Sequence, residues 1–353
     1  MMKIIRILLV MCVSLALLLS LLIYFTTYHP SEIEIQEVYS PKQIPKIQPG
    51  QTIKIMNWNV QFMAGNHNNH FFYDDGTDPW PSKESIEQTL DGIARVIQQQ
   101  APDIVLLQEV DDVASRTHRQ DQTQALLSRL PDYTAFTQTF YWKAAYVPHP
   151  DINGRVGMKL VVLSKYALSK ATRIALPAIT TDDILRRQFN LKRAMQQVHL
   201  PIEGGGELVV INTHLSAFAK GSNTMTLQVA KVMEQLTSLG SDAHWIIGGD
   251  FNLLPNDAAI ASFTEQRSHY NEQGTELTPL ITTYSSIPSL ENIQRDPEPW
   301  FTYISPSSPE KLPSRTIDYI FYSPTLENTH GNVLRGEALA LSDHLPIVAS
   351  FKL

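Results

Sequence analysis

The feature that most constrains the fold is a series of short apolar runs that recurs throughout the region 51–353. Runs of about four to eight residues rich in Val, Ile and Leu are typical of buried strands. Apolar positions spaced three and four apart occur in two longer segments, 85–100 and 226–240, and predict amphipathic helices. The apolar runs predict strands at 52–60, 102–110, 158–165, 194–202, 207–215, 244–252, 316–323 and 346–351.

Many strands with few helices between them, and no internal repeat, indicate a layered α/β domain with mixed or antiparallel sheets. Hydrophobic residues make up 43% of the 353 residues and charged residues 18%, which suits a globular protein. The formal net charge of −7 disfavours a protein that coats nucleic acid through bulk charge. The single cysteine, Cys12, leaves the body without a disulfide or a thiolate metal site.

The N-terminal region carries an apolar run, ILLVMCVSLALLLSLLIYF at 7–25, that contains no charged residue. A run of this length can cross a bilayer as a helix. Because Lys3 and Arg6 precede it, the positive-inside tendency places the N-terminus in the cytoplasm and the body outside. We therefore expect a signal-anchor helix over 1–28 in the cytoplasmic membrane.

A cleaved signal peptide is the alternative for this run, and it would make the protein secreted. Such a peptide usually has a shorter apolar region followed by a small-x-small cleavage site, which the sequence FTTYHPS does not offer. Residues 29–50 are polar, contain four prolines and are expected to form a linker. The folded domain is then expected over 51–353.

Polar side chains gather where the predicted strands end. Strand ends in layered α/β folds are where sites form, because the loops converge there on a rigid sheet. Each residue alone has an ordinary structural explanation, such as a turn or a buried histidine, and the coincidence of several carries the argument. The polar residues at strand ends are Asn57, Asn59, Gln108, Glu109, Asn212, His214, Asp250, Asn252, Asp318, Asp343 and His344.

These residue types fit metal-assisted attack of water on a phosphoester. Asn59, Glu109 and Asp343 offer the hard oxygen ligands that Mg²⁺ prefers, with Mn²⁺ as an alternative. An acid such as Asp318 can orient His344 and keep it protonated against a phosphoryl oxygen. Another acid, at position 250, can activate water, and the asparagine at position 252 can position that water or donate to the phosphoryl group.

At this point the sequence resembles the endonuclease/exonuclease/phosphatase superfamily, whose members include pancreatic deoxyribonuclease, abasic-site endonucleases and neutral sphingomyelinases. The resemblance implies a four-layered sandwich of two central mixed β-sheets flanked by helices, after one N-terminal transmembrane helix. The matching motifs occur in the family's order and are NWNVQ (57–61), DIVLLQEV (103–110), INTHL (211–215), GGDFNLLP (248–255), TIDYIFYS (316–323) and LSDHLPI (341–347).

The resemblance implies roles residue by residue. Asn59 and Glu109 would lie at the metal with Asp343 at or beside it, and His214 would contact the scissile phosphate. Asp250 would be the general base with Asn252 assisting, and Asp318 would pair with His344. Some relatives carry an acid where this chain has Gln61. The insertion 67–82 is expected to be a substrate-side loop, or alternatively a metal site built from His67, His70, Asp74 and Asp75.

Candidate substrate-binding residues lie in two segments. FYWKAAYVP at 140–148 supplies Tyr141 and Trp142, which would contact a base or a lipid headgroup or simply pack in the core. The basic run RRQFNLKR at 186–193 contains Arg193, which heads a predicted strand as a family arginine does. Weaker candidates are Arg155 and Lys159.

The function expected from these features is a membrane-anchored, Mg²⁺-dependent phosphodiesterase or phosphatase, with phospholipid or sphingolipid headgroups as plausible substrates. The first alternative is an extracytoplasmic nuclease that acts on DNA or RNA. The second is a catalytically silent binding domain. The expected partners are the phosphoester substrate and, through the N-terminal helix, a membrane. No obligate protein partner is inferred.

Overall fold

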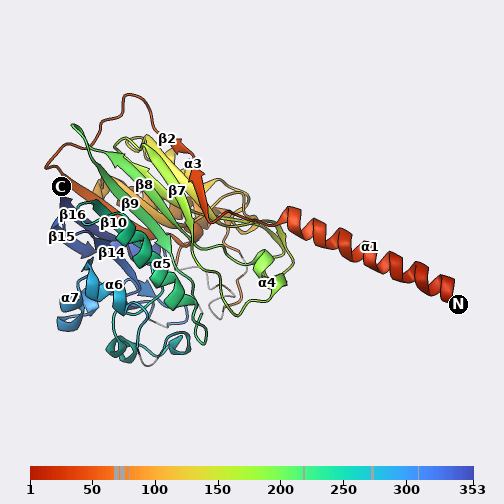
Figure 1. Ribbon diagram of the computed structural model, residues 1–353. Coiled ribbons are helices and arrows are strands. Elements are labelled where there is room, and N and C mark those ends of the chain that lie inside the picture. The colour runs from red at the N-terminus through yellow and green to blue at the C-terminus, as the bar shows by residue number, and fades with distance from the viewer. Residues whose placement is uncertain (67–70, 72–75, 79, 218, 272–273, 309) are drawn as a thin grey trace.

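The computed structural model describes residues 1–353 except 67–70, 72–75, 79, 218, 272–273 and 309. Its body contains two seven-stranded sheets that pack face to face (Figure 1). The order in sheet I is β1 (Ile33–Gln36), β7 (Lys170–Ala175), β8 (Ala194–Pro201), β9 (Glu207–His214), β10 (His244–Asp250), β14 (Asp318–Tyr322) and β11 (Ser285–Ile287). The order in sheet II is β15 (Glu327–Val333), β16 (Ile347–Lys352), β3 (Thr52–Asn59), β4 (Ile104–Asp111), β6 (Gly154–Ser164), β5 (Ala135–Val147) and β2 (Val38–Tyr39).

Each sheet is mixed, because one central pair of strands is parallel in an otherwise antiparallel arrangement. The parallel pairs are β3 with β4 and β9 with β10. A separate two-stranded ribbon consists of β12 (Tyr303–Ile304) and β13 (Pro313–Arg315). The helices are α1 (Met2–Thr26), α2 (Lys83–Gln100), α3 (Gln122–Leu127), α4 (Ile184–Phe189), α5 (Thr224–Ser238), α6 (Thr278–Thr283) and α7 (Leu290–Arg295).

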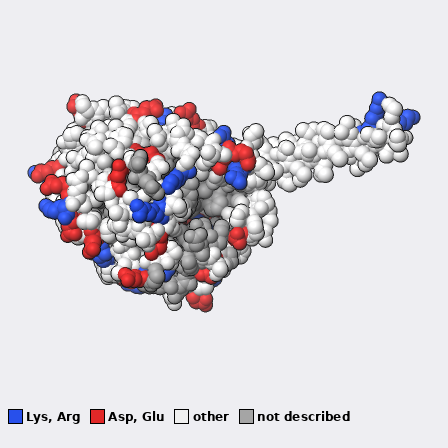
Figure 2. Space-filling model, turned by 90° about the horizontal axis from the view of Figure 1, so that it is seen from below, with Lys and Arg blue, Asp and Glu red and all other residues white. Residues whose placement is uncertain are grey.

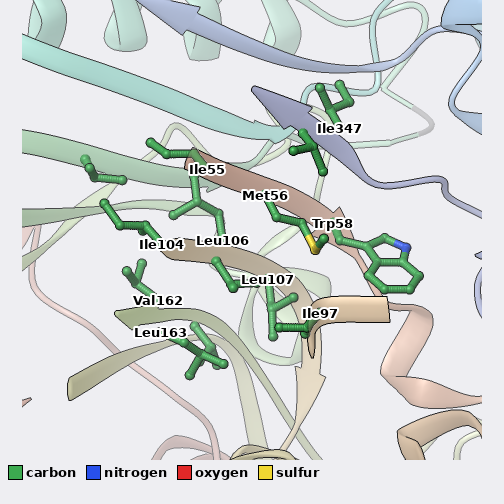
Figure 3. Packing of buried hydrophobic residues seen from close by; sticks show 14 of the residues in the cluster. Ile55, Met56, Trp58, Ile97, Ile104, Leu106, Leu107, Val162, Leu163 and Ile347 are labelled. Atoms are coloured by element: carbon green, nitrogen blue, oxygen red, sulfur yellow. The ribbon is translucent and has the colours of Figure 1, made fainter. Parts of the chain in front are cut away.

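The helices cover the outer faces of the sheets and complete the four layers. One hydrophobic cluster joins α2 to sheet II, and Figure 3 shows Ile97 of α2 beside Leu107 of β4. A second cluster joins α5, α6 and α7 to the outer face of sheet I through residues such as Val232 and Trp245. Side chains from the inner faces of both sheets, such as Leu106 and Val210, form the core between them. The expected fold class is thereby confirmed.

Glycine permits the close approach of the two sheets in this core. A Cβ added at Gly248 of β10 would lie 2.8 Å from Leu106 Cδ1 and 3.2 Å from Asn57 Oδ1. A side chain at this position would force the buried side chains of Leu106 and Asn57 to move. Gly248, the first glycine of the GGD sequence, is therefore required for the packing of the two sheets. It lies two residues before Asp250, which ends the strand.

Helix α1 lies outside the sandwich and has no buried residue (Figure 1). Its length of 25 residues and its apolar composition are sufficient to cross a membrane, and a signal sequence has the same properties. Charged side chains gather at its free end, and none lies along its shaft (Figure 2). Residues 29–50, the expected linker, contain strands β1 and β2, which pair with β7 and β5 at the edges of the sheets.

Candidate active site

The strand register brings the predicted residues together at one end of the sandwich. In sheet I, Asp250 is paired with His214 of β9 on one side and with Asp318 of β14 on the other. In sheet II, Asn59 ends β3 beside Gln108 of the parallel strand β4. Parallel neighbours end at the same edge of a sheet, and the antiparallel strand β14 begins there, so residues from five of the six motifs meet at this end.

Asp318 and His344 form a buried acid–histidine pair. Asp318 Oδ2 lies 2.8 Å from His344 Nδ1, and His344 Nε2 lies 3.6 Å from Asp250 Oδ2. Burial lowers the pKa of His344, but the carboxylates of Asp318 and Asp250 outweigh it and hold that pKa well above its usual value. The indole Nε1 of Trp58 donates to the His344 carbonyl over 2.9 Å and fixes the loop. His344 is therefore a protonated donor at the edge of the cluster.

Asp250 lies at the centre of the cluster. Its Oδ1 accepts from the backbone N–H of Asn252 over 2.9 Å, and its Oδ2 accepts from Asn59 Nδ2 over 3.0 Å. Burial is the largest effect on the Asp250 carboxyl and raises its pKa to about 7, although the positive charge of His344 lowers it. A carboxyl with this pKa can take a proton from water near neutral pH.

His214 occupies the other side of Asp250. Its Nε2 lies 3.2 Å from both Asp250 Oδ2 and Asn252 Nδ2, and its Nδ1 lies 3.3 Å from the hydroxyl of Tyr141. Burial lowers the pKa of His214 well below its usual value, and the nearby charge of Arg193 lowers it further. The pKa values of the two histidines thus shift in opposite directions, because His344 is paired with the carboxylate of Asp318 and His214 has no such partner of its own.

The residues predicted to bind the metal ion are Asn59, Glu109 and Asp343. Asn59 Nδ2 donates to Glu109 Oε1 over 3.2 Å, and Glu109 sits on a β-bulge of β4 with a left-handed φ of 59°. Asp343 lies next to His344 and is nearly buried. Glu109 and Asp343 offer carboxylate oxygens, whereas Asn59 directs its amide nitrogen at Glu109 and its Oδ1 accepts from the backbone N–H of Gln61. The surplus of carboxylates over cationic side chains in this cluster fits a hard divalent cation.

A tighter group of potential ligands lies beside this predicted set. Among the described residues, the His, Cys, Asp and Glu side chains with three ligand atoms within 4.8 Å of one another are Asp250, Asp318 and His344. Because His344 Nδ1 is engaged by Asp318, this trio fits proton chemistry better than metal binding. The assignment of the metal to Asn59, Glu109 and Asp343 stays a prediction.

The asparagines and glutamine that precede the site connect the two sheets. Gln108 Nε2 donates to Asn57 Oδ1 over 2.8 Å and to Asn212 Oδ1 over 2.7 Å. Asn57 Nδ2 reaches the carbonyl of Gly249 in the opposite sheet at 3.3 Å. All three side chains are fully buried. This network fixes the separation of the strands whose next residues are Glu109 and Asp250.

Of the substrate-binding candidates, two reach the cluster. The Tyr141 hydroxyl lies 3.3 Å from His214 Nδ1 and 3.2 Å from the backbone nitrogen of Glu109. The guanidinium of Arg193 lies 5.3 Å from the centre of the Tyr141 ring, and within the described part of the chain its buried Nη1 has no hydrogen-bond partner. This unpaired donor beside the acids is suited to bind an anionic oxygen.

The other candidates lie elsewhere. Trp142 faces the opposite side of β5 and donates from Nε1 to the Phe189 carbonyl over 2.7 Å. Lys159 is buried beside Asp112 and Asp121, and its Nζ donates to Gln138 over 2.7 Å. The backbone nitrogen of Arg155 donates to Ser115 Oγ. The insertion residues His67, His70, Asp74 and Asp75 lie outside the described residues.

Two features of the site were missed at the sequence level. The Tyr303 ring packs edge-on against His344, with 5.0 Å between ring centres. A small cavity of about 40 Å³ next to Asn252 is lined by His269, Tyr270 and Tyr303, among others. None of these aromatic residues belongs to a motif or to a predicted strand, so no sequence signal separates them from ordinary loop residues.

Three solved structures similar to this chain share its fold at low identity. An endonuclease/exonuclease/phosphatase from Beutenbergia cavernae is 20% identical with a TM-score of 0.58, covering 86% of this chain and 72% of that one. The human nocturnin catalytic domain with bound sulfate is 22% identical with a TM-score of 0.53, covering 90% and 96%. D. rerio TDP2 complexed with a single-stranded DNA product is 16% identical with a TM-score of 0.52, covering 86% and 100%.

Among curated proteins, none matches this chain. The family model described as "Endonuclease/Exonuclease/phosphatase family" matches residues 56–344, a span that runs from β3 to His344 and includes every residue of the cluster. This match extends over most of the chain, and it agrees with the sandwich and with the order of the motifs along it. The chain belongs to the endonuclease/exonuclease/phosphatase family.

Proposed function

We propose that this protein is a membrane-anchored, Mg²⁺-dependent hydrolase of phosphoester bonds that acts on the headgroups of phospholipids or sphingolipids. The observation that carries the hydrolase assignment is the cluster around Asp250, which combines an acid with a pKa of about 7 and a protonated His344. The family is generally hydrolytic and typically depends on a divalent metal, which agrees with this chemistry. The lipid headgroup is proposed because α1 would hold the site at a bilayer.

In the proposed reaction, Asp250 accepts a proton from the attacking water while the water oxygen forms a bond to phosphorus. The ester P–O bond breaks, and the leaving oxygen keeps the electron pair and takes up a proton from solvent to depart as the alcohol. His344 donates its Nε2–H to a phosphoryl oxygen as negative charge accumulates there. Asn252 and His214 orient the phosphoryl group, and the unpaired Nη1 of Arg193 binds another of its oxygens. Asn59, Glu109 and Asp343 would hold Mg²⁺, which when bound supplies positive charge to the phosphoester.

We also propose that the catalytic domain lies outside the cytoplasm. Lys3 and Arg6 precede the apolar span, and the positive-inside tendency supports an N-terminus on the cytoplasmic side. In this arrangement the cytoplasmic membrane presents its outer leaflet to the site. The protein should therefore stay with membranes after a high-salt wash, whereas release of a shortened, soluble chain would indicate signal cleavage and contradict the anchor.

The hydrolase assignment is tested with the full-length protein in detergent micelles, supplied with mixed phospholipid and sphingomyelin or with plasmid DNA. We expect headgroup release that requires Mg²⁺ and stops with EDTA. His344→Ala should lower turnover by about 10²–10⁴-fold, the range for loss of an acid–base group. Asp242→Asn, at an exposed turn, is the matched control. A His344→Ala protein that keeps the full rate would contradict the mechanism.

A nuclease is the second candidate, because one structurally similar protein, TDP2, is described in complex with a single-stranded DNA product. The net charge of −7 counts mildly against strong electrostatic binding of nucleic acid. Mg²⁺-dependent nicking of the plasmid in the same assay, without headgroup release, would select the nuclease and leave the roles of Asp250 and His344 unchanged.

A further inference from the structure

The end of α1 is attached directly to the body. Thr27, the residue after the helix, forms an isolated β-bridge with Ala144 of strand β5. The guanidinium of Arg173 then lies 5.8 Å from the ring centre of Tyr28 and donates to the carbonyl of Ser31 over 3.3 Å. Strand β1 begins at Ile33 and pairs with β7. A bilayer that contains α1 must therefore lie close to the Ala144 end of β5.

Exposed apolar side chains lie close to this point. Ile184 is 83% exposed and Leu185 is 58% exposed, at the start of the short helix α4. Trp142 Nε1 donates to the carbonyl of Phe189 and so ties the other end of α4 to β5. Figure 1 shows α4 near the body end of α1. Large aliphatic residues this exposed stabilise the protein only where something covers them.

A groove beside α4 extends this apolar face. It has a volume of about 360 Å³ and is lined mainly by Trp142, Val147, Pro148, Ile152, Leu185 and Phe189. Ala144, the partner of Thr27, belongs to the same hydrophobic cluster as Val147, with Trp142, Ile152 and Phe189 packed against it. The groove, α4 and the attachment point of α1 are thus neighbours that this cluster connects.

The charges on α4 suit a lipid surface without requiring an anionic one. Arg186 and Arg187 follow the exposed apolar pair, and both can reach phosphates at the level of the headgroups. Two acids precede the pair: Asp183 lies 3.8 Å from Arg186, and Asp182 accepts from Asn190. Because these acids offset much of the positive charge, the apolar contact is the main attraction.

We infer that α4 and the adjoining groove dock on the bilayer that α1 enters, with Ile184 and Leu185 inserted at its interface and the groove open to lipid. The inference rests on the proposed anchoring of α1 and is independent of the chemistry at Asp250. It also gives the site an orientation: Tyr141 contributes its hydroxyl to the cluster, while the next residue of β5, Trp142, lines the docked groove. Neighbouring residues of β5 thus connect the cluster to the docking surface.

Single-cysteine labelling of the full-length protein in nanodiscs tests this docking, since Cys12 is the only native cysteine. Three proteins carry an environment-sensitive fluorophore at one position each. The wild type is labelled at Cys12 within α1, and two Cys12→Ser proteins are labelled through Ile184→Cys and Thr329→Cys. The last is the matched control, exposed on β15 at the end of the body away from α1 (Figure 1).

We expect brominated phosphatidylcholine to quench the label strongly at position 12, to an intermediate extent at position 184, and not at position 329. Strong quenching at 12 with none at 184 would overturn the docking and leave the anchor intact. No quenching at 12 would overturn the anchor and the docking with it. Neither result bears on hydrolysis, which the Mg²⁺-dependent assay measures separately, and Leu185→Cys provides a second position on the same face.

Discussion

Replacing Asp250 with Asn should stabilise the folded protein while it abolishes hydrolysis. Burial is the main reason that the pKa of Asp250 rises from 3.8 to about 7. A carboxyl whose pKa is raised by folding binds its proton more tightly in the native state than in the unfolded chain. The free energy of unfolding therefore falls as the pH rises from about 4 to about 7, and the ionised Asp250 destabilises the fold at higher pH.

The size of this effect follows from the same values. The difference between 3.8 and about 7, at about 1.36 kcal/mol per pH unit, corresponds to about 4 kcal/mol of destabilisation above neutral pH. An Asn side chain directs an N–H toward Asn59 Nδ2, which is also a donor, so the loss of that hydrogen bond costs about 1–2 kcal/mol. The net gain expected at about pH 8 is roughly 2–3 kcal/mol.

The assay is urea unfolding of the full-length protein in micelles, followed by tryptophan fluorescence, with EDTA present because a bound cation would offset the carboxylate charge. The gain of Asp250→Asn should be largest at about pH 8 and should shrink as the pH falls toward about 3, where the carboxyl is mostly protonated in both states. Asp242→Asn should show no gain at any pH, since this carboxylate is exposed. An Asp250→Asn protein less stable than the wild type at about pH 8 would refute the reasoning.

Three further predictions follow from other parts of the structure. Arg193→Lys should lower kcat/KM by about 10–100-fold without changing the melting temperature, because an ammonium cannot reproduce the paired N–H donors of a guanidinium. An unchanged kcat/KM would exclude contact between Arg193 and the substrate. Gln108→Leu should lower the free energy of unfolding, measured in urea, by about 2–5 kcal/mol, because Asn57 and Asn212 each lose a buried hydrogen-bond donor. An unchanged free energy of unfolding would show that the network does not stabilise the fold. Ile184→Asp should reduce hydrolysis of vesicle lipid about tenfold, because a charged side chain would then enter the membrane interface. A soluble phosphodiester should still be cleaved at the wild-type rate, and equal losses on both substrates would contradict docking.

The sequence carried enough information to predict the layered α/β fold and the polar residues at the ends of its central strands. The apolar runs that became β3, β4, β9 and β10 are short, continuous and bounded by turns, so their positions and ends were clear. Polar residues at the ends of these strands converge because the register of the sheets places Asp250 between His214 and Asp318. In these four strands, the hydrophobic pattern of the sequence and the pairing of the strands in the sheets lead to the same arrangement.

Other features depend on long-range contacts that no local pattern encodes. Strand β5 was not predicted, because its run of aromatic and polar residues reads equally well as a surface segment. Successive side chains of that strand point to opposite faces of the sheet. Tyr141 therefore points toward the site, and Trp142 points away from it. The β-bulge that aims Glu109, and the edge pairing of β1 and β2 within the expected linker, also arise only when distant strands meet.

The central claim is that the cluster around Asp250 hydrolyses a phosphoester at a membrane. The most direct test is headgroup release from phospholipid and sphingomyelin vesicles by the full-length protein, with Mg²⁺ or EDTA, for the wild type and His344→Ala in parallel. We predict release by the wild type in Mg²⁺ only, and a loss of about 10²–10⁴-fold in the variant. Release that persists in EDTA, or that is unchanged by His344→Ala, would contradict the claim.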